Sequence, residues 1–283
     1  AGEVPRRSGH PRGGTARERT ALRASDSLAF FRAPIRAEVD GLTVSGFADQ
    51  HSSYLRELYA GKRESFTSEL FLAAIRPGSV VVDASAHVGY HTLLAARRAG
   101  TRGRVLSFEP HPRSFHCLQR NLRENGLSDR VFARRESLGD TVGIATLGDH
   151  DGSSNHTFLA RAPGGGRAVV CTTLDDALEG GRCVDVMKLD VRGRELNALR
   201  GMRRALAGSP RLRLFVRYDP AALRQLDIRP IDLLAELGEL GFQLQVIDEE
   251  HRRLAPLEEL QFVVERGARG ANLLCTLASG AAR

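Results

Sequence analysis

The sequence predicts an α/β protein built around a mostly parallel, doubly wound sheet. Apolar runs of strand length recur at Val80–Ala84, Arg104–Phe108 and Asp185–Asp190, and segments with helical spacing separate them. Strands that alternate with helices favour a parallel sheet with helices on both faces. An acidic residue stands near the end of each run or directly after it. Because ligands of such sheets bind outside the carboxyl ends of the strands, these acids mark the expected functional edge.

The chain begins with segments that precede this alternation. Residues 1–25 are rich in Gly, Pro and Arg without periodicity, so we expect a flexible extension. Ala37–Phe47 alternates weakly and predicts a short hairpin or a covering strand. Ser53–Ile75 has apolar residues at helical spacing and ends before a Pro-Gly pair, which predicts helix. We therefore expect a strand and helical cap over residues 26–76, followed by the main domain over 77–283.

The main domain opens with two strand–helix units and a third strand, predicted over Val80–Ala84, Gly89–Gly100, Arg104–Phe108, Pro112–Glu124 and Val131–Arg135. Residues 139–167 are glycine-rich and polar, with alternating pieces at Val142–Leu147 and His156–Leu159, and predict an insertion over the site. The later strands and helices are predicted at Val169–Thr173, Asp185–Asp190, Arg194–Ala207, Leu212–Val216, Pro230–Leu240, Phe242–Ile247 and Asn272–Leu277. The last two strands are expected to close the sheet as an antiparallel pair.

Length and composition exclude several classes of protein. With 283 residues and 42% hydrophobic residues, the chain suits one large α/β domain with extensions. No apolar run approaches the roughly 20 residues that span a bilayer, and the N-terminus lacks the apolar core of a signal peptide. The four cysteines form no CxxC pair, so neither a metal site nor a disulfide framework is expected. We expect a cytoplasmic protein that does not bind membranes.

The net charge of +7 does not indicate nucleic-acid binding. Residues 1–25 hold six arginines and two acids, so four of the seven charges lie in that segment. The other three are spread over the remaining chain, and no aromatic residues interleave with the arginines. We therefore do not expect a nucleic-acid partner.

The loop after the first predicted strand is the most informative motif. Asp83 ends an apolar run, small residues follow over Ala84–Gly89, and a helix begins there. Such a loop lets a ligand lie against backbone N–H groups at a helix N-terminus. Glu109 ends the next strand, where a carboxylate suits the two hydroxyls of a ribose. Together these residues predict a site for a nucleoside cofactor.

Several motifs in this order resemble those of FkbM-type methyltransferases: Pro77–Ala96, Phe108–Pro110, Asn121–Leu127, Thr173–Asp176, Val184–Asp190 and Ala271–Leu274. The resemblance covers residues 65–278. It implies a Rossmann-like, seven-stranded methyltransferase sheet with an antiparallel closing strand. It also implies S-adenosyl-L-methionine as cofactor, and methyl transfer to a hydroxyl of a sugar or natural product in a biosynthetic pathway.

The resemblance assigns roles to individual residues. The residues that it places around the cofactor are Asp83, Ser85, Ala86, His87, Gly89, Glu109, Glu136 and Ser137. Of these, Glu109 would bind the ribose, and Glu136 and Ser137 would lie near the adenine. Asp190 would face the reacting centre, and His156 in the insertion is a second candidate base. Lys188 shares a strand face with Asp190, either as a structural ion pair or in orienting the substrate.

The sequence also departs from the family pattern. Ser85 replaces the first loop glycine, which removes easy access to positive φ, and His87 replaces an asparagine. Arg192 and Arg217 stand where the family has acids. Two guanidiniums predict a small, anionic acceptor held by forked hydrogen bonds.

Three alternatives remain open for these departures. The arginines could turn outward and pair with surface acids such as Glu195 or Asp219. The fold could be repurposed for a cyclisation or an elimination. The chain could also be a non-catalytic partner of an active enzyme.

Overall fold

A computed structural model describes residues 34–148, 157–158, 166–178, 182–266 and 270–277. Its centre is an eight-stranded sheet in the order β13-β12-β14-β11-β10-β3-β4-β5. In chain order these strands are β3 (Val80–Ala84), β4 (Arg104–Phe108), β5 (Val131–Arg134), β10 (Val186–Leu189), β11 (Arg213–Tyr218), β12 (Phe242–Asp248), β13 (Arg253–Pro256) and β14 (Ala271–Leu277). The five strands from β11 to β5 are parallel, and β14 runs antiparallel between β11 and β12.

The predicted α/β class and antiparallel closing strand are confirmed. The strand β13 is an addition to the seven expected strands, and it pairs antiparallel with the edge of β12. The sequence does not predict it because the run is only four residues long, Arg253–Pro256, and ends in proline.

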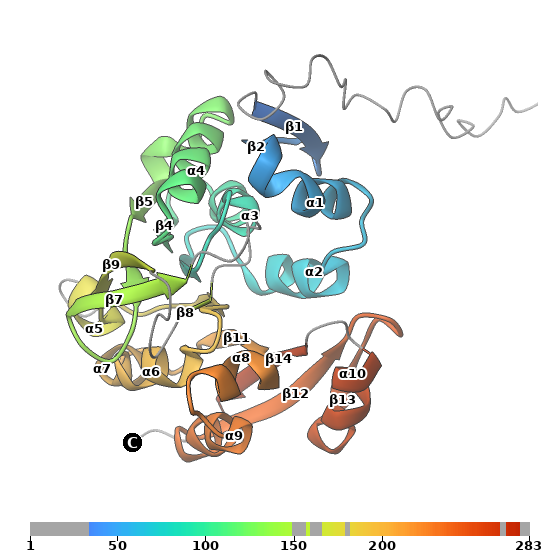
Figure 1. Ribbon diagram of the computed structural model, residues 1–283, viewed down its shortest axis with the longest axis vertical. Coiled ribbons are helices and arrows are strands. Elements are labelled where there is room, and N and C mark those ends of the chain that lie inside the picture. The colour runs from blue at the N-terminus through green and yellow to red at the C-terminus, as the bar shows by residue number, and fades with distance from the viewer. Residues whose placement is uncertain (1–33, 149–156, 159–165, 179–181, 267–269, 278–283) are drawn as a thin grey trace, which may run out of the picture.

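Helices cover both faces of this sheet (Figure 1). Their bounds are α1 (Ala48–Tyr59), α2 (Ser65–Ala74), α3 (Tyr90–Ala99), α4 (Pro112–Glu124), α5 (Leu174–Ala177), α6 (Glu195–Arg200), α7 (Arg203–Ala207), α8 (Pro220–Gln225), α9 (Pro230–Glu239) and α10 (Leu260–Arg266). Two short 3₁₀ turns lie at Ser128–Arg130 and Leu257–Glu259. Successive strand residues enter different cores, as Val81 and Val82 do, because side chains alternate across a strand.

Two expected helices are each divided in two. The predicted helix over Ser53–Ile75 breaks between α1 and α2, where Gly61 has a φ of +63°. The predicted helix over Arg194–Ala207 breaks between α6 and α7 at Gly201, where a Cβ atom would collide with the carbonyl oxygen of Gly139. Both corrections follow from glycines that take part in turns or close contacts. The short helices α8 and α10 were not predicted.

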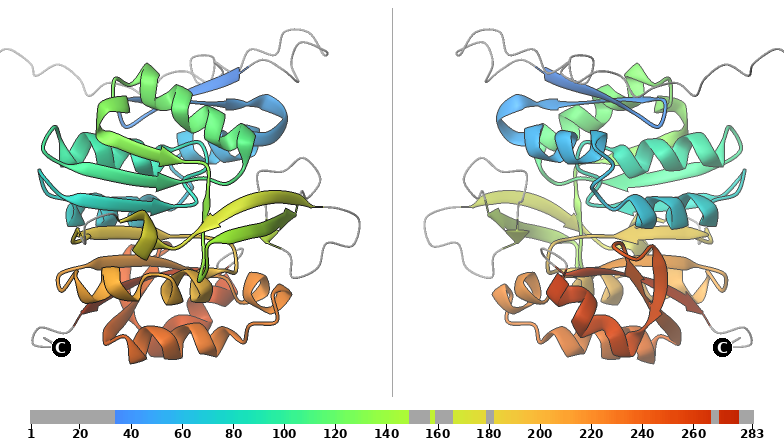
Figure 2. Two further views of the ribbon diagram at one scale, coloured as in Figure 1. Left: turned by 90° about the vertical axis from the view of Figure 1, so that its left-hand side faces the viewer. Right: turned by 90° about the vertical axis from the view of Figure 1, so that its right-hand side faces the viewer.

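The predicted insertion, residues 139–167, shares a small second sheet with the separately predicted strand Val169–Thr173, which does not join the central sheet. The strands of this second sheet are ordered β6-β9-β7-β8 and span Ser137–Leu138, Arg167–Thr172, Gly143–Gly148 and Thr157–Phe158. The antiparallel pair of β7 and β9 extends away from the central sheet (Figure 2). At its base, Leu147 is buried and faces the carboxyl edge of the central sheet.

The segment before β3 folds as the hairpin β1 (Pro34–Val39) and β2 (Leu42–Phe47), followed by α1 and α2. Its apolar side chains share one core with α3 and α4. The boundary at residue 77 between a cap and the main domain therefore remains a proposal. The predicted extension over residues 1–25 lies outside the described residues.

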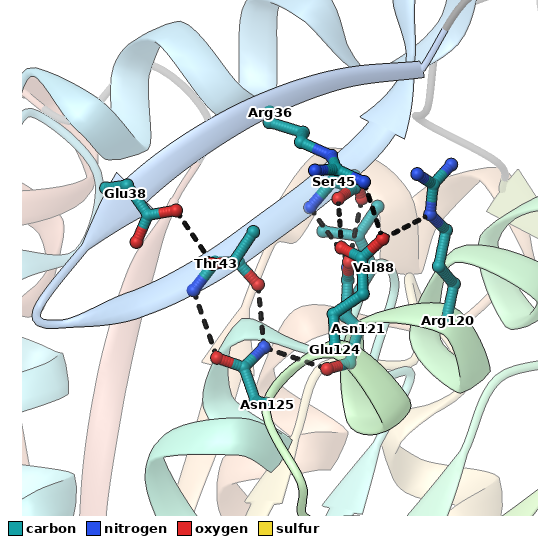
Figure 3. A network of polar contacts seen from close by, with 9 residues as sticks. All are labelled: Arg36, Glu38, Thr43, Ser45, Val88, Arg120, Asn121, Glu124 and Asn125. Carbon is teal, nitrogen blue, oxygen red and sulfur yellow. Dashed lines mark hydrogen bonds and ion pairs between the residues drawn. The ribbon is translucent and has the colours of Figure 1, made fainter.

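Asn121 of α4 and Asn125, which directly follows the helix, hold the outer edge of β2 (Figure 3). The Asn125 side chain accepts the N–H of Thr43 at 3.0 Å and donates to its carbonyl at 2.8 Å. Asn121 makes the same pair of bonds with Ser45, at 2.9 and 3.0 Å, and donates to the Val88 carbonyl at 2.7 Å. Side-chain amides thus stand in for a neighbouring strand. They also tie the hairpin to the loop after β3.

Candidate active site

A pocket of about 660 Å³, counting open solvent at its mouth, lies at the carboxyl ends of β3, β4 and β10. This is the edge that the sequence predicted for a ligand. The residues that line it are Tyr54, Arg63, Glu64, Asp83, Ser85, Ala86, His87, His91, Glu109, Pro110, Leu147, Lys188, Asp190 and Arg192. Most of the predicted site residues therefore meet in one place. Within the described residues, no cluster of His, Cys, Asp and Glu suits a metal ion.

Glu109 is held by backbone groups on both sides. Its two carboxylate oxygens accept the N–H of His87 at 2.7 Å and the N–H of His111 at 2.8 Å. Only 4% of its surface is exposed, and this burial raises the pKa of Glu109 to about 7 even though the two N–H groups favour the anion. Each oxygen has a second lone pair, so a carboxylate fixed in this way can still accept hydrogen bonds from a ligand.

Asp83 is fixed by neighbouring hydroxyls. The Thr92 hydroxyl donates to Asp83 at 2.6 Å and contacts the Ser107 hydroxyl at 2.9 Å. Burial raises the pKa of Asp83, and the ammonium of Lys188 opposes this shift. Asp83 therefore keeps one orientation at the end of β3.

The loop between Asp83 and α3 has the strained geometry that its departures from the family pattern imply. The N–H groups of Ser85 and Ala86 both donate to the carbonyl of Phe108, at 2.8 and 2.9 Å. Ser85 has a φ of +70° and His87 a φ of +55°, a region that glycine and asparagine adopt more easily. The serine that replaces a glycine thus keeps a glycine-like backbone at a cost in free energy.

Side chains around the loop hold it in place. The His87 ring packs edge-on against Tyr54 and His51 of α1, with centroids 4.4 and 4.9 Å apart. Gly89 begins α3 with a φ of +95°, and a Cβ atom there would lie 2.5 Å from a Leu118 methyl group. Close packing of the backbone therefore requires a glycine here, and contact of Gly89 with the cofactor stays a prediction.

The opposite side of the pocket is a row of alternating charges. The Lys188 ammonium lies 3.7 Å from Glu64 and 3.4 Å from Asp190, whose other oxygen is 3.5 Å from the Nε atom of Arg192. Burial opposes ionisation of Asp190, yet Lys188 and Arg192 outweigh it and hold the pKa of Asp190 well below its ordinary value. In the same way Lys188 lowers the pKa of Glu64 to about 2.

Lys188 is the shared counter-ion of this row. Burial disfavours the ammonium, but Glu64 and Asp190 more than compensate and raise the pKa of Lys188. A permanently charged ammonium has no lone pair with which to accept a proton. The geometry therefore supports the interpretation of Lys188 as an ion-pair partner that positions Asp190.

The two arginines line adjoining pockets, not the single mouth that was predicted. Arg192 lies beside Asp190 in the pocket described above, whereas Arg217 of β11 lines a second pocket that shares Glu64 with the first. The wall between them is Glu64, which precedes α2. The acids proposed as outward partners are engaged elsewhere: Glu195 is buried and accepts the Gly193 N–H, and Asp219 caps α8.

Glu136 and Ser137 are not among the residues that line this pocket. Glu136 forms an ion pair with Arg134 at 3.0 Å, and the Ser137 hydroxyl donates to the Leu138 carbonyl at 3.3 Å. Their contact with a cofactor stays a prediction. His156 lies outside the described residues.

The segments around α1 and α2 supply site residues that the sequence did not reveal. Tyr54 lies in α1, while Arg63 and Glu64 lie in the turn before α2. The Arg63 guanidinium stacks 4.8 Å from the centre of the Tyr54 ring. His91, in the first turn of α3, contacts the Ser68 hydroxyl at 3.2 Å, and burial lowers the pKa of His91 to about 3. No local pattern marks Tyr54, Arg63 or Glu64, because the tertiary fold brings them to the pocket, whereas the position of His91 at the start of a predicted helix does indicate a possible contact with the cofactor.

Comparisons with known proteins agree with this geometry. The model of the methyltransferase FkbM domain matches residues 83–244, more than half of the chain. The hexuronic acid methyltransferase AglP of Haloferax volcanii is 27% identical over 181 residues, which are 62% of this chain and 71% of that protein.

Two solved structures can also be superposed on the chain. A SAM-dependent O-methyltransferase from Thermotoga maritima has 16% identity and a TM-score of 0.42, over 77% of this chain and 65% of its own. A TehB-like SAM-dependent methyltransferase from Corynebacterium glutamicum has 11% identity and a TM-score of 0.46, over 81% and 95%.

Proposed function

Because the chain belongs to the FkbM family of S-adenosylmethionine-dependent methyltransferases, we propose that it methylates an oxygen of a small sugar or natural product that carries an acidic group. One observation carries this proposal: Asp83, Glu109 and Asp190, from three adjacent parallel strands, line a single pocket. Acids at these three strand ends serve a nucleoside cofactor and a reacting centre side by side.

The residues present fit the cofactor that the family requires. Glu109 has lone pairs left for the two ribose hydroxyls, and its backbone anchors fix their direction. When bound, S-adenosylmethionine supplies a methyl group on a positively charged sulfur. Asp190 and Glu64 contribute negative charge that suits such a cation, and Lys188 keeps both of them ionised.

The acceptor is inferred from the arginines and from the relative. AglP is named for methylation of a hexuronic acid, a sugar that carries a carboxylate. Arg192 and Arg217 offer planar guanidiniums that match a carboxylate, and they stand where the family has acids. These observations support an anionic sugar over a neutral one.

Asp190 is the residue that we place against the acceptor hydroxyl. Methyl transfer needs the attacking oxygen aligned with the methyl group, and a carboxylate that accepts its hydrogen bond supplies that alignment. The low pKa of Asp190 keeps it available as an acceptor throughout the physiological range. His156 remains the second candidate base.

Calorimetric titration with S-adenosylmethionine tests the proposal. The Glu109→Ala variant should bind the cofactor more weakly by about 1.5–3 kcal/mol, the range for hydrogen bonds to a charged group. Asp190→Asn should retain most of the affinity and lose methyl transfer. Failure of the unaltered protein to bind the cofactor, or unchanged affinity in Glu109→Ala, would refute the assignment.

A further inference from the structure

The second pocket adjoins the first at Glu64 and has a different character. Its lining includes the cations Arg217, Lys62 and Arg266, the acids Glu64, Asp248, Glu249 and Glu250, and Asn272. Arg266 pairs with Asp248 at 3.2 Å and with Glu250 at 3.4 Å. It is the larger of the two, with about 1230 Å³ of empty space including open solvent. The cavity itself has about 620 Å³, which accommodates a sugar unit. A ligand there would reach the first pocket past Glu64.

Glu64 is held in an unusual backbone conformation at this junction. It precedes α2 with φ +46° and ψ +38°, the left-handed region that a side chain larger than glycine adopts at a cost. Strained residues of this kind cluster at functional sites, where the surrounding structure keeps them in place.

The Glu64 side chain does not cap the start of α2, because other residues of the second pocket do so. Glu249 accepts the N–H groups of Phe66 and Thr67 at 2.9 and 2.8 Å, so it caps the start of α2. Asn272 of β14 donates to the Thr67 hydroxyl at 3.1 Å. Because these contacts fix the helix start, the Glu64 carboxylate is directed to Lys188 and to the two pockets instead.

The charges on the two sides of Glu64 are complementary to an anionic sugar. The contact between Glu64 and Lys188 is long, 3.7 Å, which leaves both Glu64 oxygens able to accept a hydrogen bond. On the far side, Arg217 brings a planar guanidinium, whose fork of N–H donors matches the shape of a carboxylate. A carboxylate would thus meet Arg217, and a hydroxyl of the same ring would meet Glu64.

Resting on the function proposed above, we propose that the second pocket is the acceptor subsite and that it takes a hexuronate unit. Arg217 binds the sugar carboxylate, and Glu64 accepts a hydrogen bond from a ring hydroxyl beside the one that faces Asp190. Glu64 is therefore a specificity-determining residue, and Arg192 stays with Asp190 at the reacting centre.

A pair of probes that differ only in the carboxylate tests the subsite. The protein is saturated with S-adenosylhomocysteine and titrated with p-nitrophenyl β-D-glucuronide or with p-nitrophenyl β-D-glucoside. The glucuronide should bind at least about tenfold more tightly, the effect of a charge-assisted hydrogen bond. Arg217→Met should remove this preference. The control Arg252→Met, whose arginine pairs with Glu69 on the surface, should keep it.

Methyl transfer to the glucuronide tests Glu64. In Glu64→Gln, kcat should fall at least about tenfold while the affinity for S-adenosylhomocysteine stays unchanged. Glu69→Gln, in the helix that follows Glu64 but outward-facing, should transfer at the unaltered rate. Wild-type transfer by Glu64→Gln, or loss of its cofactor affinity, overturns the role of Glu64.

The outcomes separate this inference from the proposed function. Equal binding of the two probes, or binding of neither, by a protein that still binds its cofactor overturns the uronate subsite and leaves the methyltransferase function standing. A protein that binds no cofactor fails the proposed function itself.

Discussion

The two sides of the active-site pocket are built in different ways. On the cofactor side, Glu109 is fixed by N–H groups of His87 and His111 and lies on the strand next to Asp83. On the acceptor side, Glu64 and Asp190 meet through Lys188, although they lie far apart in the sequence. The first side depends on backbone geometry, which a short motif encodes. The second depends on side-chain charges that only the complete fold brings together.

This contrast predicts different responses to substitution. The backbone N–H groups that hold Glu109 remain in place when a neighbouring side chain is replaced, so this side should tolerate a change in side-chain charge. A buried row of charges does not, since removal of one member leaves its neighbours unpaired in a medium of low dielectric constant.

The largest effect is expected from Lys188→Met. Loss of the ammonium leaves Glu64 and Asp190 buried without their shared counter-ion, which should lower the free energy of unfolding by about 3–5 kcal/mol. Urea denaturation with linear extrapolation measures this change. Lys62→Met replaces the other lysine of the chain, which is exposed, and should have little effect. A loss below about 1 kcal/mol in Lys188→Met would show that the row of charges is not coupled.

The pH dependence of cofactor binding should come from the other side of the pocket. With a pKa of about 7, Glu109 takes up a proton as the pH falls from 8 to 6, so the affinity for S-adenosylmethionine should drop about tenfold. Glu109→Gln should abolish this dependence. Glu195→Gln should retain it, although the pKa of Glu195 is also raised by burial, to about 8. Affinity that is constant with pH in the unaltered protein would contradict the assignment.

Stability without cofactor should change with pH in the opposite direction. The pKa of Glu109 is raised in the folded state above its ordinary 4.5, so the folded protein binds more protons between pH 4.5 and 7. The contribution of Glu109 is complete below pH 4.5 and is lost as the pH rises through 7. Urea denaturation of the unaltered protein and Glu109→Gln across this range separates it from other groups.

The smallest effect is expected in the loop. Ser85→Gly should relieve the left-handed conformation, tighten cofactor binding several-fold and raise stability by less than about 1 kcal/mol. His87→Gly relieves a similar φ but removes ring contacts with Tyr54 and His51, so it should destabilise the protein. Calorimetry and thermal unfolding of both variants measure the difference. Weaker binding in Ser85→Gly would show that the serine hydroxyl contacts the cofactor.

The sequence predicted the parts of the site that local patterns determine. Apolar runs that end in acids placed Asp83, Glu109 and Asp190 correctly at the carboxyl edge of a parallel sheet. It did not predict Glu64, because that role depends on how the fold brings the turn before α2 to Lys188 of β10. The expected placement of Arg192 and Arg217 at one pocket mouth failed for the same reason, since Glu64 stands between them. The spacing of residues along the sequence does not show which distant side chains the fold brings together.

The hydrogen bonds from the Asn121 and Asn125 side chains to β2 affect whether copies of the chain can associate through this strand. An open strand edge presents unpaired N–H and carbonyl groups that a second molecule can extend into a larger sheet. Asn121 and Asn125 already form hydrogen bonds with the N–H and carbonyl groups of Ser45 and Thr43. These backbone groups are therefore not available to pair with a strand of another molecule. The protection exists only once α4 has formed and docked. A nascent or partly unfolded chain therefore exposes this edge, and crowding and heat should promote aggregation through the hairpin first.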